Sequence, residues 1–408
     1  MTAPERPRSY RRLALDPRFG PFLGAALVSN VGNWFHVVTS VIVVYELTGS
    51  ALVVGLISFS NFAAFLFLTP LAGTTTDRFP RREVLASAQA GSVIVAALLA
   101  AAFLTGRGSA VVVLAASLLL GVGSVFSIPA TLSIVPELVG DRDHTAAITL
   151  NTMAINVARM IGPVAGAFVL AQAGAGVAFA VNSASFAVFA LVCLWLPGAP
   201  RGSADRGGDR RYRAALSLVW RDPSLRMLFA GVLVVGVLLE PNTTLAAPVA
   251  DVVGAPSAFV GWIVGAFGAG ALLGGVPARR TVILGLPTSS AGFATAAVAL
   301  VAIATARSAW LVLLGFAGLG AGYLAAISAL TTAIQRRAPA AIRGRVMALW
   351  SQLLLGIRPV SSLVLGALTD LSSVRVATWL LVALAVLGWW SSKRAHRPIP
   401  DPGPSGPS

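Results

Sequence analysis

The 408-residue sequence is poor in charge, cysteine, histidine and lysine. Charged residues make up 11% of it, against roughly 25% in soluble domains, which leaves too little charge to cover a water-facing surface. Cys193 is the one cysteine, so an internal disulfide is excluded, and no metal-ligand spacing is present. The three histidines are far apart in sequence, and there is no nucleotide-binding loop or nucleophile triad. We therefore expect no enzyme, no metal and no cofactor.

Long apolar runs dominate what is present, since 56% of the residues are hydrophobic and the mean hydropathy is +0.83. A helix needs about 20 apolar residues to cross a bilayer core of about 30 Å. The first run, 22–45, exceeds the length of a signal-peptide core, so we interpret it as a retained span. Twelve apolar segments are predicted to span the membrane: 20–46, 51–75, 84–105, 109–135, 145–171, 174–196, 224–249, 257–277, 281–305, 308–334, 345–368 and 372–392.

A polar stretch over 198–223 divides these segments six and six. The sequence Ile161-Gly-Pro163-Val164 in the fifth segment recurs as Ile357-Arg-Pro359-Val360 in the eleventh. Parallel repeats are typical of transporters, although chance recurrence of proline is the alternative. The expected fold is an all-α integral membrane protein with twelve transmembrane helices in two pseudo-symmetric six-helix bundles. Its parts are an N-terminal segment (1–19), two bundles (20–197 and 224–392), a central loop (198–223) and a disordered tail (393–408).

The net charge of +15 comes almost entirely from arginine, because Lys393 is the only lysine. Alternate loops and the termini hold 25 of the basic residues and the other loops only three. This asymmetry indicates the positive-inside rule and anionic lipid rather than nucleic acid. Both termini and the central loop are therefore predicted to be cytoplasmic.

Several motifs together identify a family. The loop after the second segment reads Gly73-Thr-Thr-Thr-Asp77-Arg78-Phe-Pro-Arg81-Arg82, the first loop reads Leu47-Thr-Gly-Ser-Ala-Leu-Val-Val-Gly55, and Arg343-Gly-Arg345-Val opens the eleventh segment. Over about 15–395 the chain resembles the major facilitator superfamily, in the branch of the enterobactin and macrolide exporters. Pro80 stands where that family usually has glycine.

The resemblance implies that Asp77 belongs to a latch between the two halves at the cytoplasmic side. Its expected partner is the positive N-terminal end of the eleventh helix near Arg345, while Gly73 permits close helix contact. A charge that merely stops a span is the alternative. The remaining basic residues of the gate motif are interpreted mainly as topology determinants: Arg78, Arg81 and Arg82.

The fifth segment contains Gly162-Pro163-x-x-Gly166, which resembles the antiporter motif of the superfamily. The match is partial, because Ala158 and Ala167 stand where the family often has glycine. Small residues let helices approach closely and proline kinks a span. The functional interpretation is an interface that seals an exporter on one side, and the alternative is generic packing.

Three charged residues lie deep inside apolar segments, where a charge costs about 2.5–3.5 kcal/mol or more at the centre. Arg159 and Arg358 suit an anionic ligand, with a structural pair as the alternative. Glu240 is the best candidate for proton coupling, unless it lies solvated near the outer interface. Further cavity or coupling candidates are His36, Asn33 and Asn156. The fourth segment lacks the arginine of many proton-driven exporters, so proton coupling is inferred mainly from the resemblance.

These observations predict a monomeric, multi-pass transporter of the bacterial plasma membrane. It would export a hydrophobic or amphipathic small molecule, such as a drug, antibiotic or siderophore, by alternating access and proton antiport. The expected partners are that substrate, the proton and the lipid bilayer. The alternatives are an uptake symporter and a non-transporting membrane sensor or partner subunit on the same scaffold.

Overall fold

The computed structural model describes residues 8–196, 208–274, 288–339 and 342–395, and in these ranges the chain is helical without β-strands. Nine helices there are long and apolar enough to cross a membrane. One of them, α6, has 52 residues and holds two spans, and α10 and α12 are shorter apolar helices. Together they account for the twelve predicted spans.

The first half contains five helices that follow the short helix α1 (Tyr10–Ala14): α2 (Phe19–Thr48), α3 (Ala51–Arg78), α4 (Arg81–Leu104), α5 (Ala110–Val139) and α6 (His144–Trp195), with a 3-10 turn η1 (Asp141–Asp143) before α6. Gly49 ends α2 with a φ of 63°, and the Ser50 side chain caps α3 by accepting from the Val53 amide. Gly174, with a φ of 81°, breaks α6 into two arms at the predicted boundary between spans.

The second half has α8 (Pro223–Leu238), the π-helical turn η2 (Pro241–Leu245), α9 (Ala246–Val252), α10 (Phe259–Gly274), α12 (Thr288–Ala304), α13 (Ala309–Arg337), α14 (Arg343–Leu371) and α15 (Val374–Ala395). A further helix, α7 (Gly208–Arg221), lies within the stretch expected to be a polar loop. Its apolar positions recur at helical spacing, so α7 is amphipathic. The prediction of a loop was wrong here, because it was based on the polar composition of the stretch. Asp222 follows α7 and caps α8, because its side chain accepts hydrogen bonds from the Ser224 and Leu225 amides.

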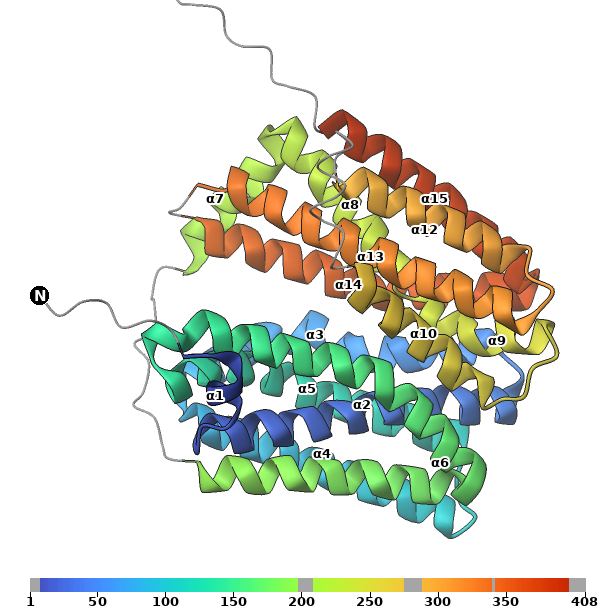
Figure 1. The fold of residues 1–408 in the computed structure, drawn as a ribbon, viewed down its shortest axis with the longest axis horizontal. Helices are drawn as coiled ribbons and strands as arrows, with labels where there is room; N and C mark the ends of the chain where they lie inside the picture. The colour runs from blue at the N-terminus through green and yellow to red at the C-terminus, as the bar shows by residue number, and fades with distance from the viewer. Residues whose placement is uncertain (1–7, 197–207, 275–287, 340–341, 396–408) are drawn as a thin grey trace, which may run out of the picture.

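The two halves lie side by side, with their helices running in roughly the same direction (Figure 1). Within the halves α2 packs along α6 and α12 along α13, and between them α3 meets α14 and α6 meets α10. Contacts of this kind rely on van der Waals packing, because lipid supplies no hydrophobic drive between helices. At Gly320 an added Cβ would lie 2.0 Å from the Phe267 carbonyl oxygen, so only glycine allows this approach of α13 to α10.

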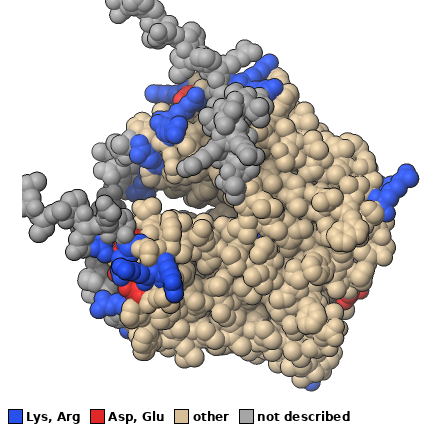
Figure 2. Space-filling view, viewed as in Figure 1, with Lys and Arg blue, Asp and Glu red and all other residues tan. Residues whose placement is uncertain are grey.

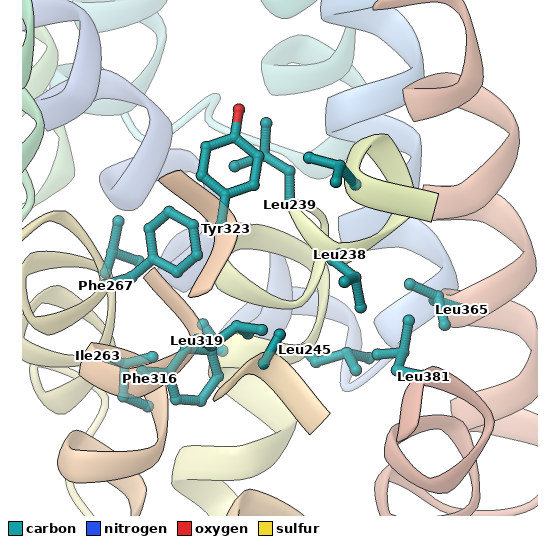
Figure 3. Packing of buried hydrophobic residues seen from close by; sticks show 14 of the residues in the cluster. Leu238, Leu239, Leu245, Ile263, Phe267, Phe316, Leu319, Tyr323, Leu365 and Leu381 are labelled. Atoms are coloured by element: carbon teal, nitrogen blue, oxygen red, sulfur yellow. The ribbon is translucent and has the colours of Figure 1, made fainter. Parts of the chain in front are cut away.

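Buried apolar side chains form a continuous core across the second half around the break between α8 and α9 (Figure 3). Leu238 and Leu245 flank this break, and the tilted rings of Phe267 and Tyr323 contact each other with centroids 5.7 Å apart. The Tyr323 hydroxyl points away from the apolar side chains beside it (Figure 3). The core therefore fixes the broken helix and directs one polar group towards the first half.

Basic side chains gather at one end of the bundle, here called the arginine-rich end, and most of the remaining surface is uncharged (Figure 2). This end carries the α3–α4, α5–α6 and α13–α14 connections, with Arg81, Arg82, Arg142, Arg336 and Arg343. The other end, here called the opposite end, carries Arg107, Arg307 and Arg375. The surface is hollowed between the halves at the arginine-rich end (Figure 2).

Candidate functional site

The seventh span is broken where α8 meets η2. Pro241 has no amide hydrogen to donate, and the Glu240 carbonyl instead accepts from the amides of Thr243 and Thr244 at 3.0 and 2.9 Å. The π turn that results is a rare geometry that often marks functional sites. It is completely buried, as is the Glu240 side chain that precedes it.

Glu240 forms an ion pair with Arg358 from α14. The Arg358 Nε atom lies 2.6 Å from the Glu240 Oε1 atom, and Glu240 is 0% exposed. This burial excludes the alternative of a solvated carboxylate near an interface. Arg358 therefore has a partner within the protein, and its role in binding an anionic ligand stays a prediction. Two charges taken out of water require such a partner, because either one alone would be strongly destabilising.

Side chains of the first half reach this pair across the seam. The Arg358 guanidinium lies 3.8 Å from the centre of the Phe62 ring of α3, as in a cation–π contact. The Thr243 hydroxyl lies 3.4 Å from Glu240 Oε2 and 3.5 Å from the Ser58 hydroxyl of α3. A change in the charge of the pair would therefore directly alter its contacts with α3.

Arg159 differs from Arg358, because it has no hydrogen bond or ion pair among the described residues. Its guanidinium lies 5.1 Å from the centre of the Trp34 ring, and its Nε atom is buried without a partner. Its backbone packs against α10 of the second half, where a Cβ added at Gly268 would lie 2.8 Å from the Arg159 carbonyl oxygen. Arg159 is thus an uncompensated cation on the seam, which suits an anionic group of a ligand.

The other predicted cavity residues lie away from the ion pair. His36 is 1% exposed, its Nε2 atom lies 3.4 Å from the Ser40 hydroxyl, and its Nδ1 atom has no partner among the described residues. Asn156 donates to the Thr152 carbonyl of its own helix at 3.0 Å. Asn33 is exposed and precedes Trp34, whose ring lies against Arg159.

The glycines of the antiporter-like motif pack within the first half. An added Cβ at Gly162 would lie 2.7 Å from the Val31 carbonyl oxygen, and one at Gly166 would lie 2.9 Å from that of Phe35. Both neighbours belong to α2, so this face of the motif closes α6 on α2. The Pro163 carbonyl instead faces Gly261 of α10, where a Cβ would approach it to 2.7 Å. Only this second face lies on the seam between the halves.

The gate motif lies at the arginine-rich end, where α3 passes into α4. Arg81 forms an ion pair with Glu137 of α5 and donates to the Ser133 carbonyl at 3.4 Å. Arg82 donates to the Leu196 carbonyl at 2.6 Å. These two arginines therefore tie α4 to α5 and to the end of α6, in addition to any role in topology.

The gate motif has four further residues: Gly73, Asp77, Arg78 and Arg345. Gly73 and Asp77 belong to α3, but their side chains lie outside the part of the structure that is described. Arg78 is exposed at the end of α3, and Arg345 lies in the first turn of α14. A latch between Asp77 and Arg345 stays a prediction.

A second junction between the halves closes the opposite end. Asp370, near the end of α14, accepts hydrogen bonds from the Ser50 hydroxyl at 2.5 Å and from the Ala51 and Leu52 amides at 2.8 and 3.0 Å. The carboxylate thus occupies the N-terminus of α3, where the helix dipole favours an anion. Tyr45 adds a longer contact to Asp251, 3.5 Å away.

An ionic cluster holds the N-terminal segment at the arginine-rich end. Arg8 donates to Asp143 through Nε at 2.5 Å and through its backbone amide at 2.8 Å, and to Asp16 through Nη1 at 2.7 Å. The hydrogen bonds from the Arg8 side chain and then from its amide lower the pKa of Asp143 below the ordinary value of 3.8. The segment is therefore clamped by a carboxylate that stays charged near neutral pH.

Sequence reasoning missed the partners of these residues. Glu137 and Asp370 lie outside the motifs that it used, and Asp370 falls beyond the predicted end of the eleventh segment at 368. Phe62 and Tyr323 give no signal in an apolar sequence. A carboxylate next to the C-terminal end of a span was the one available sign for Asp370.

The comparisons agree with this architecture. Residues 17–396 match the model of a major facilitator superfamily family described as transmembrane secretion effector. The multidrug efflux pump Tap of Mycolicibacterium fortuitum is 27% identical over 380 residues, which cover 90% of this chain and 92% of that protein. The staphyloferrin A transporter of Staphylococcus aureus is 25% identical over 176 residues, covering 42% of this chain and 44% of the other.

Solved structures share the fold. A bacterial homologue of the human lysosomal transporter Spinster, in an inward-facing and unoccupied conformation, superposes with a TM-score of 0.76 at 14% identity. The superposition covers 93% of this chain and 97% of the other. The chain therefore belongs to the major facilitator superfamily, in its family of transmembrane secretion effectors, and is a multi-pass membrane transporter.

Proposed function

We propose that this protein is a proton-coupled exporter of hydrophobic or amphipathic small molecules in the bacterial plasma membrane, with both termini cytoplasmic. The observation that carries the proposal is the buried pair of Glu240 and Arg358 at the broken seventh span, in contact with α3 of the other half. A carboxylate buried against a cation, at a seam that has to move, is suited to couple a proton to that movement.

The coupling follows from the energetics of the pair. Protonation of Glu240 removes its charge and leaves Arg358 with a neutral partner, and breaking a buried pair costs about 3–5 kcal/mol. Reversing a two-state population from 1:99 to 99:1 requires about 5.5 kcal/mol. A single protonation therefore supplies most of the bias that alternating access needs, and it acts on α3 through Phe62 and Thr243.

The two ends of the bundle are consistent with an inward-facing state. The opposite end is closed by Asp370 on the N-terminus of α3, and the hollow between the halves lies at the arginine-rich end. With the arginine-rich end cytoplasmic under the positive-inside rule, the hollow between the halves would open to the cytoplasm. This is the state in which an exporter takes up its substrate.

Arg159 is the residue on which we expect an anionic or carboxylate-bearing part of the substrate to bind. It is unpaired among the described residues and is backed by the Trp34 ring. The name of Tap, a multidrug efflux pump, supports export and a broad substrate range. The antiporter-like motif of α6 supports the same direction, since Pro163 faces α10 on the seam.

Expression in a host that lacks its own efflux pumps, followed by a panel of antibiotics and siderophores, tests the proposal. Resistance to a compound identifies it as exported. In everted vesicles with a pH-sensitive dye, that compound should release protons from acid-loaded vesicles. Glu240→Gln should abolish the release, whereas Glu46→Gln, an exposed carboxylate at the opposite end, should leave it unchanged.

Two results would contradict the proposal. Accumulation of a compound in whole cells, driven by the proton gradient, would indicate an uptake symporter. The absence of flux for every compound, in a correctly inserted protein, would favour a membrane sensor or partner subunit.

A further inference from the structure

The first half contains a polar pocket of about 200 Å³ that the ion pair and the gate do not use. Residues of α2, α4, α5 and α6 line it, and its lining includes amide and hydroxyl side chains but no charged one. Polar side chains in a membrane-spanning region are unfavourable unless they face protein partners or water-filled space. Such a concentration of them around one cavity therefore needs an explanation.

The pocket has hydrogen-bonding capacity that the protein does not use. Gln89 is 6% exposed, and its Oε1 atom is buried without a partner among the described residues. Its Nε2 atom has one long contact, 3.5 Å from the Ser127 hydroxyl. Asn151 is also 6% exposed and makes no hydrogen bond within the described residues. A buried acceptor left unmatched costs about 1–3 kcal/mol, so Gln89 favours a ligand that can donate a hydrogen bond, and the amide of Asn151 offers a further donor and acceptor.

On the first arm of α6, Arg159 lies one helical turn beyond the last residue that lines the pocket. Asn151 and Ile155 both line it and precede Arg159 by eight and four residues on α6, so the three share one helix face. Asn33 lines the pocket from α2, next to the Trp34 ring that lies against Arg159. Asn33 is exposed, whereas Gln89 and Asn151 of the same lining are buried. A molecule bound by Arg159 on the seam could thus extend a second group into this pocket.

We propose that the pocket is a substrate subsite for a neutral group rich in hydroxyls or amides, such as a glycosyl group. Amides and hydroxyls both donate and accept, which matches a polyol, and the absence of a charged lining side chain gives no counter-charge to an ion. The nearby Arg159 disfavours a cation. The volume corresponds to about seven waters at roughly 30 Å³ each, which is enough for a single sugar ring. The subsite rests on the proposed transport function and adds a substrate class to it.

Equilibrium binding tests the subsite without a gradient or net transport. Isothermal titration calorimetry on the full chain in lipid nanodiscs would compare resveratrol and quercetin, each with and without a glucosyl group. Wild type should bind each glucoside about tenfold more tightly than its aglycone, the equivalent of roughly 1.4 kcal/mol. Gln89→Met keeps the length of the side chain but removes its hydrogen bonds, so it should reduce this preference to about twofold or less while aglycone affinity stays unchanged.

Gln172→Met is the matched control, because Gln172 lies on α6 but is exposed outside the pocket. It should keep the full preference for glucosides. A wild type without a preference for either glucoside would overturn the subsite and leave a pocket for water only. Equal weakening of glucoside and aglycone by Gln89→Met would also overturn it, because that pattern indicates a purely structural role.

The outcomes for the subsite and for the proposed function are separable. If no compound is exported but glucoside binding depends on Gln89, the subsite holds and the exporter does not. If compounds are exported but binding ignores the glucosyl group, the exporter holds and the subsite does not.

Discussion

Arg358 donates from Nε to Oε1 of Glu240 over 2.6 Å, and the Glu240 side chain is 0% exposed. Arg159, the other arginine deep inside a predicted span, has no comparable partner among the described residues. The two arginines therefore have different physical roles: one is half of a buried ion pair and the other is an uncompensated cation. This difference separates a coupling element from a binding element and leads to distinct predictions.

The pair should behave as a unit in a double-mutant cycle. Glu240→Ala or Arg358→Ala alone leaves a buried charge and should lower the free energy of unfolding by about 3–5 kcal/mol. The double variant should be less destabilised than the sum of the two, because neither charge remains. Thermal unfolding in detergent measures this, and simple additivity of the two losses would show that the pair is not energetically coupled.

Removing the charge of Arg159 should weaken substrate binding rather than folding. Arg159→Gln should reduce affinity for an anionic substrate about tenfold, since a charged hydrogen bond contributes roughly 1.5–3 kcal/mol. The thermal unfolding temperature should not fall, because no ion pair among the described residues is lost. Arg107→Gln, an exposed residue of a loop at the opposite end, is the control. A neutral substrate whose binding is weakened equally would argue against an anion-binding role.

Asp77→Asn should stop transport while the protein still inserts and folds. The motif predicts a latch at the arginine-rich end, and a neutral amide loses most of its attraction for the N-terminus of α14. Efflux assays on membranes with matched expression levels measure the effect. Normal efflux would show instead that Asp77 only stops a span.

The arrangement of spans was predictable because apolar runs of about 20 residues have few other structures available in a bilayer. The break between the arms of α6, at Gly174, lies at the predicted edge between the segments 145–171 and 174–196. The helix α7 was not predicted, because its polar composition is typical of a loop and only the spacing of its apolar residues indicates a helix. The positions and ends of the spans depend on the local sequence, so they can be predicted from it.

Pairings between spans were not predictable. Glu240 and Arg358 were both recognised as charges in apolar segments, but their contact depends on α8 lying against α14, which no local pattern encodes. Gln89 was not singled out, because a glutamine in a span gives no sign of which face it occupies. The site depends on which helices pack together, and a single sequence contains little information about such long-range contacts.

The clamp on the N-terminal segment should be insensitive to pH near neutrality. The Arg8 hydrogen bonds lower the pKa of Asp143, so their contribution is fully present above the ordinary value of 3.8 and is lost as pH falls through the lower folded value. A spin label at Leu15, which is 72% exposed, in a Cys193→Ser background should become mobile only below about pH 3.8. In Asp143→Asn it should be mobile throughout, and a transition near neutral pH would contradict the assignment.

Closure of the opposite end should depend on Asp370 more than on Asp251. Asp370 receives one hydroxyl and two amide hydrogen bonds at the N-terminus of α3, whereas Asp251 has a single contact at 3.5 Å with Tyr45. Loss of the charge at a helix N-terminus costs about 0.3–1 kcal/mol, with further loss from the hydrogen bonds. Asp370→Asn should therefore raise the outward-open population several-fold. Spin–spin distances between labels on α3 and α14 at this end report it, and Asp251→Asn is the control. Equal shifts in the two variants would show that general surface charge, rather than the capped helix, holds this end closed.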